Sequence, residues 1–292
     1  MVLSKQELKM VENTFIELLK NKIGPLVKSH AGTNLQSYDD KSNGVDLVTA
    51  LDRKIESMIK SELASKYPKF KFIGEETYVE GVTKITDDPT FIVDPIDGTT
   101  NFIHGYPYSC TSLGLAEMGE PVVGAVFNPH LNQLFHASKG NGAFLNDQEI
   151  EVTERPLTLQ KSLIALEGGS ERTESSQGNF DKKMDTYKNL LSESGAFVHG
   201  FRSVGSAAMN ICYVANGMLD AYWEGGCWAW DVCAGWCILK ETGGIMIGGN
   251  PEEWDIPLDR RCYFAIRSGC EPRDQKQFAE AFWSHVAGKL EY

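Results

Sequence analysis

The sequence lacks the features that mark several specialised classes of protein. Its seven cysteines are scattered and include no Cys-x-x-Cys pair, so neither a disulfide framework nor a zinc ribbon is expected. No apolar run is long enough to span a bilayer, and residues 1–9 lack the apolar core of a signal peptide. No internal repeat or low-complexity tract is present. A globular protein of the cytoplasm is therefore the default expectation.

The chain also has fewer basic than acidic residues. The chain has 28 Lys and Arg against 40 Asp and Glu, a formal net charge of −12, which argues against nucleic acid or an anionic membrane as a partner. Its 292 residues, 42% of them hydrophobic, are enough to bury a core in one large domain or two tightly joined halves. An acidic protein that handles an anionic substrate needs cations to mediate the contact, which suits a bound metal.

Residues 91–101 read Phe-Ile-Val-Asp-Pro-Ile-Asp-Gly-Thr-Thr-Asn and are the most informative stretch. A β-branched run reaches Asp94, and Pro95 disfavours the helical conformation there and removes a ladder donor. We therefore expect a strand that stops with Asp94 and Asp97 at its carboxyl end. Gly98 permits a turn, and the residues after it suit the start of a helix. Carboxylates bind hard cations and free helix amides bind anions, so a divalent metal with a phosphate satisfies both.

The spacing of apolar residues predicts two helices and then a sheet in the first half, to about residue 155. One long helix is expected near 5–29, and Thr49 is expected to cap a second that ends at Pro68 and carries Asp52 in its first turn. Alternating patterns predict strands, largely antiparallel, at 70–73, 91–93, 111–117, 121–128 and 133–137. This half is predicted to be α+β.

The second half, from about 156 to 292, alternates between the two patterns and is predicted to be α/β. We expect extended segments at 162–167, 196–201 and 217–223, and helices at 181–191, 206–214 and 232–242. No linker divides the halves, so residues 1–292 are predicted to form one domain. Cys233 and Cys237 lie one helical turn apart among apolar residues and are expected to be buried rather than metal-ligating.

Further acids lie at the ends of predicted elements. Glu75 and Glu76 follow a strand, and Asp231 stands directly before the helix at 232–242, where it is expected to serve as an N-cap and is also able to bind a metal. Mg²⁺ takes oxygen ligands and keeps several waters, so a few carboxylates suffice. No His or Cys accompanies Asp94, Asp97 and these acids, which disfavours zinc.

Five ordered blocks resemble the inositol monophosphatases, members of a lithium-sensitive, magnesium-dependent phosphatase superfamily. The two most specific are Asp94-Pro-Ile-Asp-Gly-Thr-Thr-Asn101 and Trp230-Asp-Val-Cys-Ala-Gly235, the latter continuing through Glu241-Thr-Gly-Gly244. The others are Asp46-Leu-Val-Thr-Ala-Leu-Asp52, Phe72-Ile-Gly-Glu-Glu76 and Gly200-Phe-Arg-Ser-Val-Gly-Ser-Ala-Ala208. Together the blocks cover most of the chain. The resemblance implies a layered α-β-α-β-α sandwich and a homodimer.

The resemblance also implies roles for single residues. The metal ligands would be Glu75, Asp94, Asp97, Asp231 and the carbonyl of Ile96, and they would hold two or three Mg²⁺. Gly98 and Thr99 would bind the substrate phosphate through their amides, while Asp52 and Thr99 would pair to orient the attacking water. Glu75 or Thr99 would accept its proton. The substrate contacts would be Glu75, Ile96, Asp97, Gly98, Thr99, Gly205, Ser206, Ala207, Glu224 and Asp231. Ser170 and Lys41 match further polar positions near the site.

One segment departs from the family pattern. Between Glu224 and Asp231 the chain reads Gly225-Gly-Cys-Trp-Ala-Trp230, where the family more often carries His or a smaller residue. We expect Trp228 to pack against the following helix rather than to contact a substrate, since Trp fills cores well.

Three functions remain open. The first is Mg²⁺-dependent, lithium-inhibited hydrolysis of myo-inositol monophosphates without a covalent intermediate. The second is a related bisphosphatase or 3′-phosphoadenosine nucleotidase, and the third a non-enzymatic binding protein on the same fold. Glu224 suits a pair of polyol hydroxyls, and no basic residue for a second phosphate is evident, which favours the first. The intact set of acids argues against the third, because idle neighbouring carboxylates repel one another.

Overall fold

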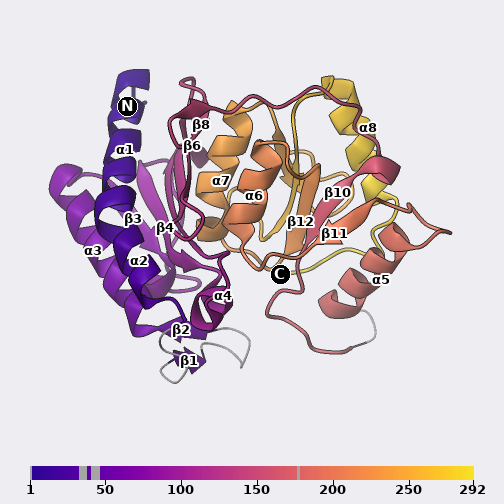
Figure 1. Ribbon diagram of the computed structural model, residues 1–292, viewed down its shortest axis with the longest axis horizontal. Helices are drawn as coiled ribbons and strands as arrows, with labels where there is room; N and C mark the ends of the chain where they lie inside the picture. Colours follow the sequence, from indigo (N-terminus) through magenta and orange to yellow (C-terminus); the bar gives the residue numbers. More distant parts are fainter. Residues whose placement is uncertain (1, 33–37, 41–46, 176–177) are drawn as a thin grey trace.

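The computed structural model describes residues 2–32, 38–40, 47–175 and 178–292, and its helices and sheets alternate in layers (Figure 1). A seven-stranded and a five-stranded sheet lie on either side of two helices, α6 (Ala207–Ala215) and α7 (Ala229–Glu241). Further helices cover the outer faces of both sheets. The predicted mixed α/β sandwich is therefore confirmed.

The first sheet has the order β3-β4-β5-β6-β7-β8-β9. Only its first pair, β3 (Lys71–Gly74) with β4 (Thr90–Asp97), is parallel among the described strands, so the largely antiparallel character is confirmed. The others are β5 (Cys110–Glu117), β6 (Glu120–Asn128), β7 (Gln133–Ser138), β8 (Ala143–Leu145) and β9 (Gln148–Glu149), of which the last two were not predicted. A two-stranded sheet, β1 (Tyr38–Asp40) with β2 (Leu47–Thr49), was also not predicted.

The helices on this sheet begin and end close to where the sequence places them. The segment predicted as one helix is α1 (Lys5–Leu18), a π-helical turn η1 (Leu19–Ile23) and α2 (Gly24–His30) in succession. Pro25 in the first turn of α2 donates no backbone N–H, which disturbs the regular ladder where the π turn lies. Helix α3 (Ala50–Lys66) ends before Pro68 and carries Asp52 in its first turn, as predicted. The short η2 (Glu75–Thr77) and α4 (Thr99–His104) follow β3 and β4.

Strand β4 does not stop at Asp94, contrary to the prediction from Pro95. It continues to Asp97, and its pairing with β5 shifts register between Asp94 and Asp97. A β-bulge accommodates a residue that cannot donate to the ladder, so the proline bends the strand without ending it. Both acids still lie at the carboxyl end of the strand.

The second sheet has the order β11-β10-β12-β14-β13. Strand β10 (Leu163–Leu166) runs parallel to β11 (Gly200–Arg202) and β12 (Ala221–Gly225), whereas β14 (Cys262–Ile266) is antiparallel to β12 and to β13 (Ile245–Gly248). Helices α5 (Asn179–Leu191) and α8 (Pro272–Trp283) lie beside this half, and η3 (Leu159–Lys161) precedes β10. The strands predicted at 196–201 and 217–223 begin later, and β13, β14 and α8 were not predicted.

Helix α7 is the buried centre of the molecule, and a glycine lets it approach the first sheet closely. All seven cysteines are free, and Cys233 and Cys237 of this helix are buried, as predicted. A Cβ added to Gly124 of β6 would lie 2.1 Å from the carbonyl oxygen of Ala234 in α7. Only glycine therefore allows this helix–sheet distance, which fixes the height of α7, and of the residues at its start, above the sheet.

The variant Gly124→Ala should separate α7 from β6 or force the chain to shift. We expect it to lower the free energy of unfolding by about 1 to 3 kcal/mol, the range for overpacked interiors. Denaturant unfolding with unchanged m-value would measure this. The control is Gly200→Ala, whose added Cβ meets nothing closer than 3.9 Å. Equal losses in the two variants would contradict the close-packing explanation.

Candidate active site

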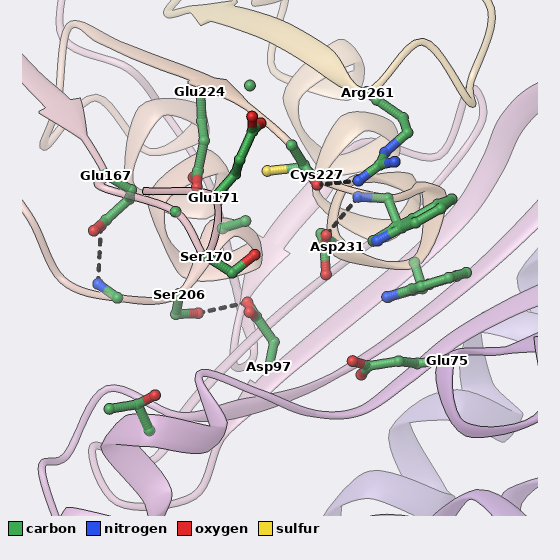
Figure 2. Close-up of a pocket in the computed structure, with 18 of the residues that line it drawn as sticks. Glu75, Asp97, Glu167, Ser170, Glu171, Ser206, Glu224, Cys227, Asp231 and Arg261 are labelled. Atoms are coloured by element: carbon green, nitrogen blue, oxygen red, sulfur yellow. Dashed lines mark hydrogen bonds between the residues drawn. The ribbon is translucent and has the colours of Figure 1, made fainter. Parts of the chain in front are cut away.

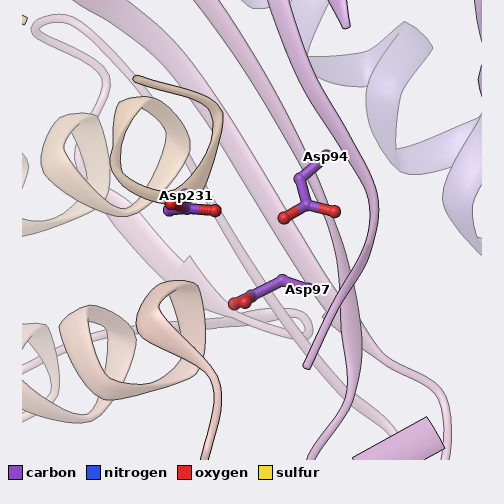
Figure 3. A group of neighbouring side chains, drawn as sticks. All are labelled: Asp94, Asp97 and Asp231. Carbon is purple, nitrogen blue, oxygen red and sulfur yellow. The ribbon is translucent and has the colours of Figure 1, made fainter. Parts of the chain in front are cut away.

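Three carboxylates converge where β4 ends and α7 begins (Figure 3). Asp94 and Asp97 come from the bulged end of the strand, and Asp231 comes from the first turn of the helix. Each offers an oxygen, and these oxygens lie within 4.8 Å of one another. Asp94 and Asp97 are buried at 2% and 8% exposure. Three acids from segments more than 130 residues apart thus share one small volume.

Burial and mutual repulsion act on the pKa values of these acids in the same direction. Burial raises the pKa of Asp94 well above its ordinary value, and the charges of Glu75, Asp97 and Asp231 raise it further. The pKa of Asp231 is likewise raised well above its ordinary value, by burial first and then by the charges of Asp97 and Glu75. Asp94 Oδ1 is buried and accepts no hydrogen bond. Without a cation such a carboxyl takes up a proton, and a hard cation is the partner that would hold it in its charged form.

Asp97 differs because helix α6 holds one of its oxygens. Its Oδ2 accepts hydrogen bonds from the Ser206 hydroxyl at 2.6 Å and from the Ala208 amide at 2.7 Å. Burial raises the pKa of Asp97 to about 6, and these bonds oppose the rise. Ser206 also caps α6, accepting from the Met209 amide at 3.2 Å. Helix α6, which lies between the two sheets, thereby fixes the orientation of a carboxylate on the first sheet.

Asp231 caps α7, but not from the predicted position. The helix begins at Ala229 with Trp228 as the N-cap, three residues before the predicted start, so Asp231 lies in the first turn. Its Oδ2 accepts the Trp228 amide hydrogen at 2.6 Å, the backward half of a capping box. The sequence misled because the apolar pattern extends through Ala229 and Trp230. The other carboxylate oxygen is left to face Asp94 and Asp97.

A cavity of about 750 Å³ opens above the three acids (Figure 2). Seven of the residues predicted to form the site line it: Glu75, Asp97, Gly205, Ser206, Ala207, Glu224 and Asp231. Ser170, matched with less weight, lines it as well. The sequence-predicted substrate side and metal side therefore face one space.

The other predicted residues lie below or beside this cavity. Asp94 and Asp52 are buried, the latter in α3, and the side chain of Ile96 belongs to the core under the first sheet. The Ile96 carbonyl accepts the Thr99 hydroxyl at 3.0 Å. Lys41 and Asp46 lie outside the described residues.

Gly98 has a backbone conformation and surroundings that favour glycine. Its φ is +82°, and an added Cβ would lie 2.8 Å from the Tyr108 carbonyl oxygen and 2.9 Å from that of Gly205. The turn after β4 therefore sits against the loop before α6, which joins the predicted phosphate-binding turn to the predicted substrate-binding loop.

Glu224 forms a polar wall on the far side of the cavity from Glu75 (Figure 2). Burial raises its pKa to about 8, and the charge of Glu167 acts in the same sense, whereas the Tyr222 hydroxyl and Lys183 act against them. The Tyr222 hydroxyl donates to Glu224. Lys183 is fully buried, and its ammonium donates to the Gly168 carbonyl at 2.9 Å. A carboxyl so placed is suited to bonding hydroxyl groups of a ligand.

Sequence reasoning missed Glu167. This buried acid accepts four hydrogen bonds: from the Val204 amide, the Gly205 amide and the Asn210 side chain at 2.8 Å each, and from the Ser203 hydroxyl at 2.6 Å. It fixes the loop that carries Gly205, Ser206 and Ala207. A signal was present, because Glu167 directly follows β10 and precedes Gly168-Gly169, just as the other acids follow strands.

The cavity walls hold groups that the sequence did not place there. Trp228 packs against the core that α7 helps to form, as predicted, but it is half-buried and also lines the cavity. Basic residues also lie at the cavity although none was evident from the sequence: Arg53, Arg172 and Arg261. The pairing of β12 with β14 brings Arg261 beside Gly226, a long-range contact that no local pattern encodes.

Comparisons with known proteins identify the family. The model of the inositol monophosphatase family matches residues 7–287. The chain belongs to the inositol monophosphatase family. It is 84% identical to inositol monophosphatase 2 of Saccharomyces cerevisiae over the full length of both chains. It is 42% identical to human inositol monophosphatase 1, with 76% of this chain and 77% of that one covered.

A solved structure agrees as well. The extragenic suppressor protein suhB from Bartonella henselae superposes with a TM-score of 0.77 and 30% identity, covering 94% of this chain and 98% of that one. The protein is therefore a phosphatase of the inositol monophosphatase family. Metal dependence is a property of this family, and the buried acids fit it: Asp94 Oδ1 has no partner among the described residues, and hard oxygen ligands suit a hard cation. No helix of the described residues is both long and apolar enough to cross a membrane.

The variant Asp94→Asn tests whether the acid cluster binds a cation. Without metal it should unfold at a temperature equal to or above that of the wild type, because a repelling buried charge is removed. Mg²⁺ should stabilise the wild type, by about 2.7 kcal/mol at a hundred times its dissociation constant, and should not stabilise the variant. Thermal unfolding with and without Mg²⁺ measures both. Asp147→Asn, at a side chain 94% exposed, is the control. An equal Mg²⁺ shift in Asp94→Asn would contradict the assignment.

The variant Glu167→Gln tests whether Glu167 holds the loop at 205–207 in place. Its amide offers one acceptor oxygen where the carboxylate serves four donors, so the Val204 and Gly205 amides lose partners. We expect a loss of about 1 to 3 kcal/mol in unfolding free energy. We also expect a higher KM for inositol 1-phosphate, with kcat changed less. Glu174→Gln, at an exposed position, is the control. An unchanged KM would show that the loop keeps its conformation without Glu167.

Proposed function

We propose that this protein hydrolyses myo-inositol monophosphates to myo-inositol and phosphate, that it depends on two or three Mg²⁺, and that Li⁺ inhibits it. The observation that carries the proposal is the convergence of Asp94, Asp97 and Asp231, with the unpartnered oxygen of Asp94, at the floor of the cavity that Glu224 lines. Acids that demand a cation thus face a wall suited to polyol hydroxyls. Family membership supports the reaction class.

The metal ions would be held by Glu75, Asp94, Asp97, Asp231 and the carbonyl of Ile96. When bound, they would polarise the phosphate oxygens, lower the pKa of a coordinated water and stabilise charge on the departing oxygen. Glu75 lines the cavity beside this floor, at the end of β3. Its position directly after β3, the strand that pairs with β4, supports its inclusion with the three acids.

The protein's own groups would bind and orient the substrate. The amides of Gly98 and Thr99 would hold the phosphate, while the loop at 205–207 and Glu224 would bind the inositol hydroxyls. This fixes phosphorus over the acids and the ester oxygen toward the inositol side, as attack in line with the departing oxygen requires.

The proton transfer uses residues beside the turn after β4. Glu75 would take a proton from the attacking water, or Thr99 would take it while passing its own hydroxyl proton to Asp52. A bond forms between the water oxygen and phosphorus, the bond from phosphorus to the inositol oxygen breaks, and that oxygen leaves as a hydroxyl after taking a proton from solvent. No covalent intermediate with the protein is needed.

We also propose that residues 1–292 act as one domain, with halves at about 1–155 and 156–292, and that two copies form a homodimer. The packing of α7 on strands of both sheets supports the first proposal. Resemblance to the family supports the second.

A panel of substrates tests the activity. Inositol 1-phosphate, fructose 1,6-bisphosphate and 3′-phosphoadenosine 5′-phosphate would each be incubated with and without Mg²⁺, and phosphate release measured. We expect Mg²⁺-dependent release from inositol 1-phosphate, suppressed by Li⁺, and loss of several kcal/mol of transition-state stabilisation in Asp94→Asn. Release from the nucleotide alone would support the nucleotidase alternative, and release from none would overturn both enzymatic functions.

A further inference from the structure

Arg261 lies at the edge of the cavity on the same side as Asp231 and across from Glu167 (Figure 2). Its guanidinium carbon stands 3.5 Å from the centre of the Trp228 ring, a close cation–π contact. The Trp228 ring in turn stacks on Trp230, with centroids 5.2 Å apart and planes within 14°. Tyr78 packs against both indoles, with ring centroids 5.2 Å from Trp228 and 4.9 Å from Trp230. The arginine therefore rests on a rigid aromatic support.

Most of the hydrogen-bonding capacity of Arg261 is unused. A guanidinium carries five N–H donors, and among the described residues that of Arg261 makes one hydrogen bond, from Nη2 to the Gly226 carbonyl at 3.0 Å. Nε is buried without an acceptor, while Nη1 makes no hydrogen bond and is not buried. A half-buried cation in this state is costly unless an anion completes it.

The other arginines of the described chain that are buried or half-buried are neutralised, whereas Arg172 and Arg202, which have no carboxylate partner either, are exposed. Arg267 and Arg155 share Asp220, and Arg260 contacts Glu253. No carboxylate of the described residues lies within 4.0 Å of a nitrogen of Arg261, although the cavity is rich in acids. The guanidinium is thus the one half-buried positive group of the described cavity wall whose charge no protein anion offsets.

We propose that Arg261, held on Trp228, is a subsite for a second anionic group carried by the leaving group of the substrate. This rests on the proposed function, because the first phosphate must occupy the metal site. A stacked guanidinium keeps its in-plane N–H groups pointing outward, where they meet the two oxygens of a phosphate or carboxylate side by side. The acids elsewhere on the wall repel such a group, so Arg261 selects its position.

The cavity also has the room that a second group requires. Its volume of about 750 Å³ lies well within the range of pockets that enclose drug-sized ligands, whereas a six-carbon polyol phosphate is smaller. The ligand class is therefore a sugar or polyol phosphate with a second phosphate or carboxylate at the end remote from the bond that is cleaved.

Competition against inositol 1-phosphate hydrolysis tests the subsite with two inhibitors that differ in one phosphate, fructose 1-phosphate and fructose 1,6-bisphosphate. In the wild type the bisphosphate should have an inhibition constant about tenfold lower, the scale of one charge-assisted bidentate contact. Arg261→Gln should abolish that advantage and leave the constant for fructose 1-phosphate within about twofold. The control, Arg273→Gln, removes a charge from an exposed position of α8 and should retain the advantage.

The outcomes separate this proposal from the proposed function. If the wild type does not hydrolyse inositol 1-phosphate, the proposed function fails, and calorimetric titration with the same two ligands still measures the subsite. Equal affinity of the wild type for the two ligands, or equal weakening of both by Arg261→Gln, would overturn the subsite. Where Arg261→Gln does not fold, Arg261→Lys, which keeps the charge but loses the fork, should lose part of the advantage, and full retention would count against it.

Discussion

The repulsion among Asp94, Asp97 and Asp231 is the constraint on which the rest of this structure depends. Three carboxylates, two of them buried, whose oxygens lie within 4.8 Å cannot all be charged without a cation, and the raised pKa values of Asp94 and Asp231 express that conflict. A fold that served stability alone would separate these groups. Here the layers bring them together, so part of the folding free energy is spent on a site that is complete only with metal.

Different local interactions hold the acids in place, and together these interactions connect the two sheets. A bulge at Pro95 keeps Asp94 and Asp97 together at the end of β4, and the amino end of α6 holds Asp97 from the other half. Asp231 is fixed by the Trp228 amide and by the height of α7 over the first sheet, which Gly124 permits. Small shifts between the layers therefore alter the spacing of the acids, and packing far from the cavity bears on metal affinity.

The sequence predicted the parts of the site that are encoded locally. Asp94-Pro-Ile-Asp-Gly and the acids that follow strands carry their own turn and cap chemistry, so their clustering at strand ends was predictable. The course of β4 past Pro95 was not, because a bulge depends on the partner strand. Nor was the position of Asp231 within α7, since apolar spacing leaves the first turn of a helix undefined by several residues. Strands β13 and β14 are short, largely apolar runs without alternation, which periodicity does not separate from other buried segments, so the position of Arg261 was not predicted either.

The position of Arg261 could not be predicted for a physical reason that also bears on substrate choice. Metal ligands must lie within a few ångströms of one ion, so they come from strand ends and helix starts with short, recognisable motifs. A group that meets the leaving group need only face the cavity, and long-range pairing can bring it there from any segment. Arg261 reaches the wall through the register of β14 against β12, and Trp228 reaches it from the turn before α7. Chemistry is therefore fixed by motif and selectivity by tertiary contact, so chains that share the acid set are free to differ in the leaving groups they accept.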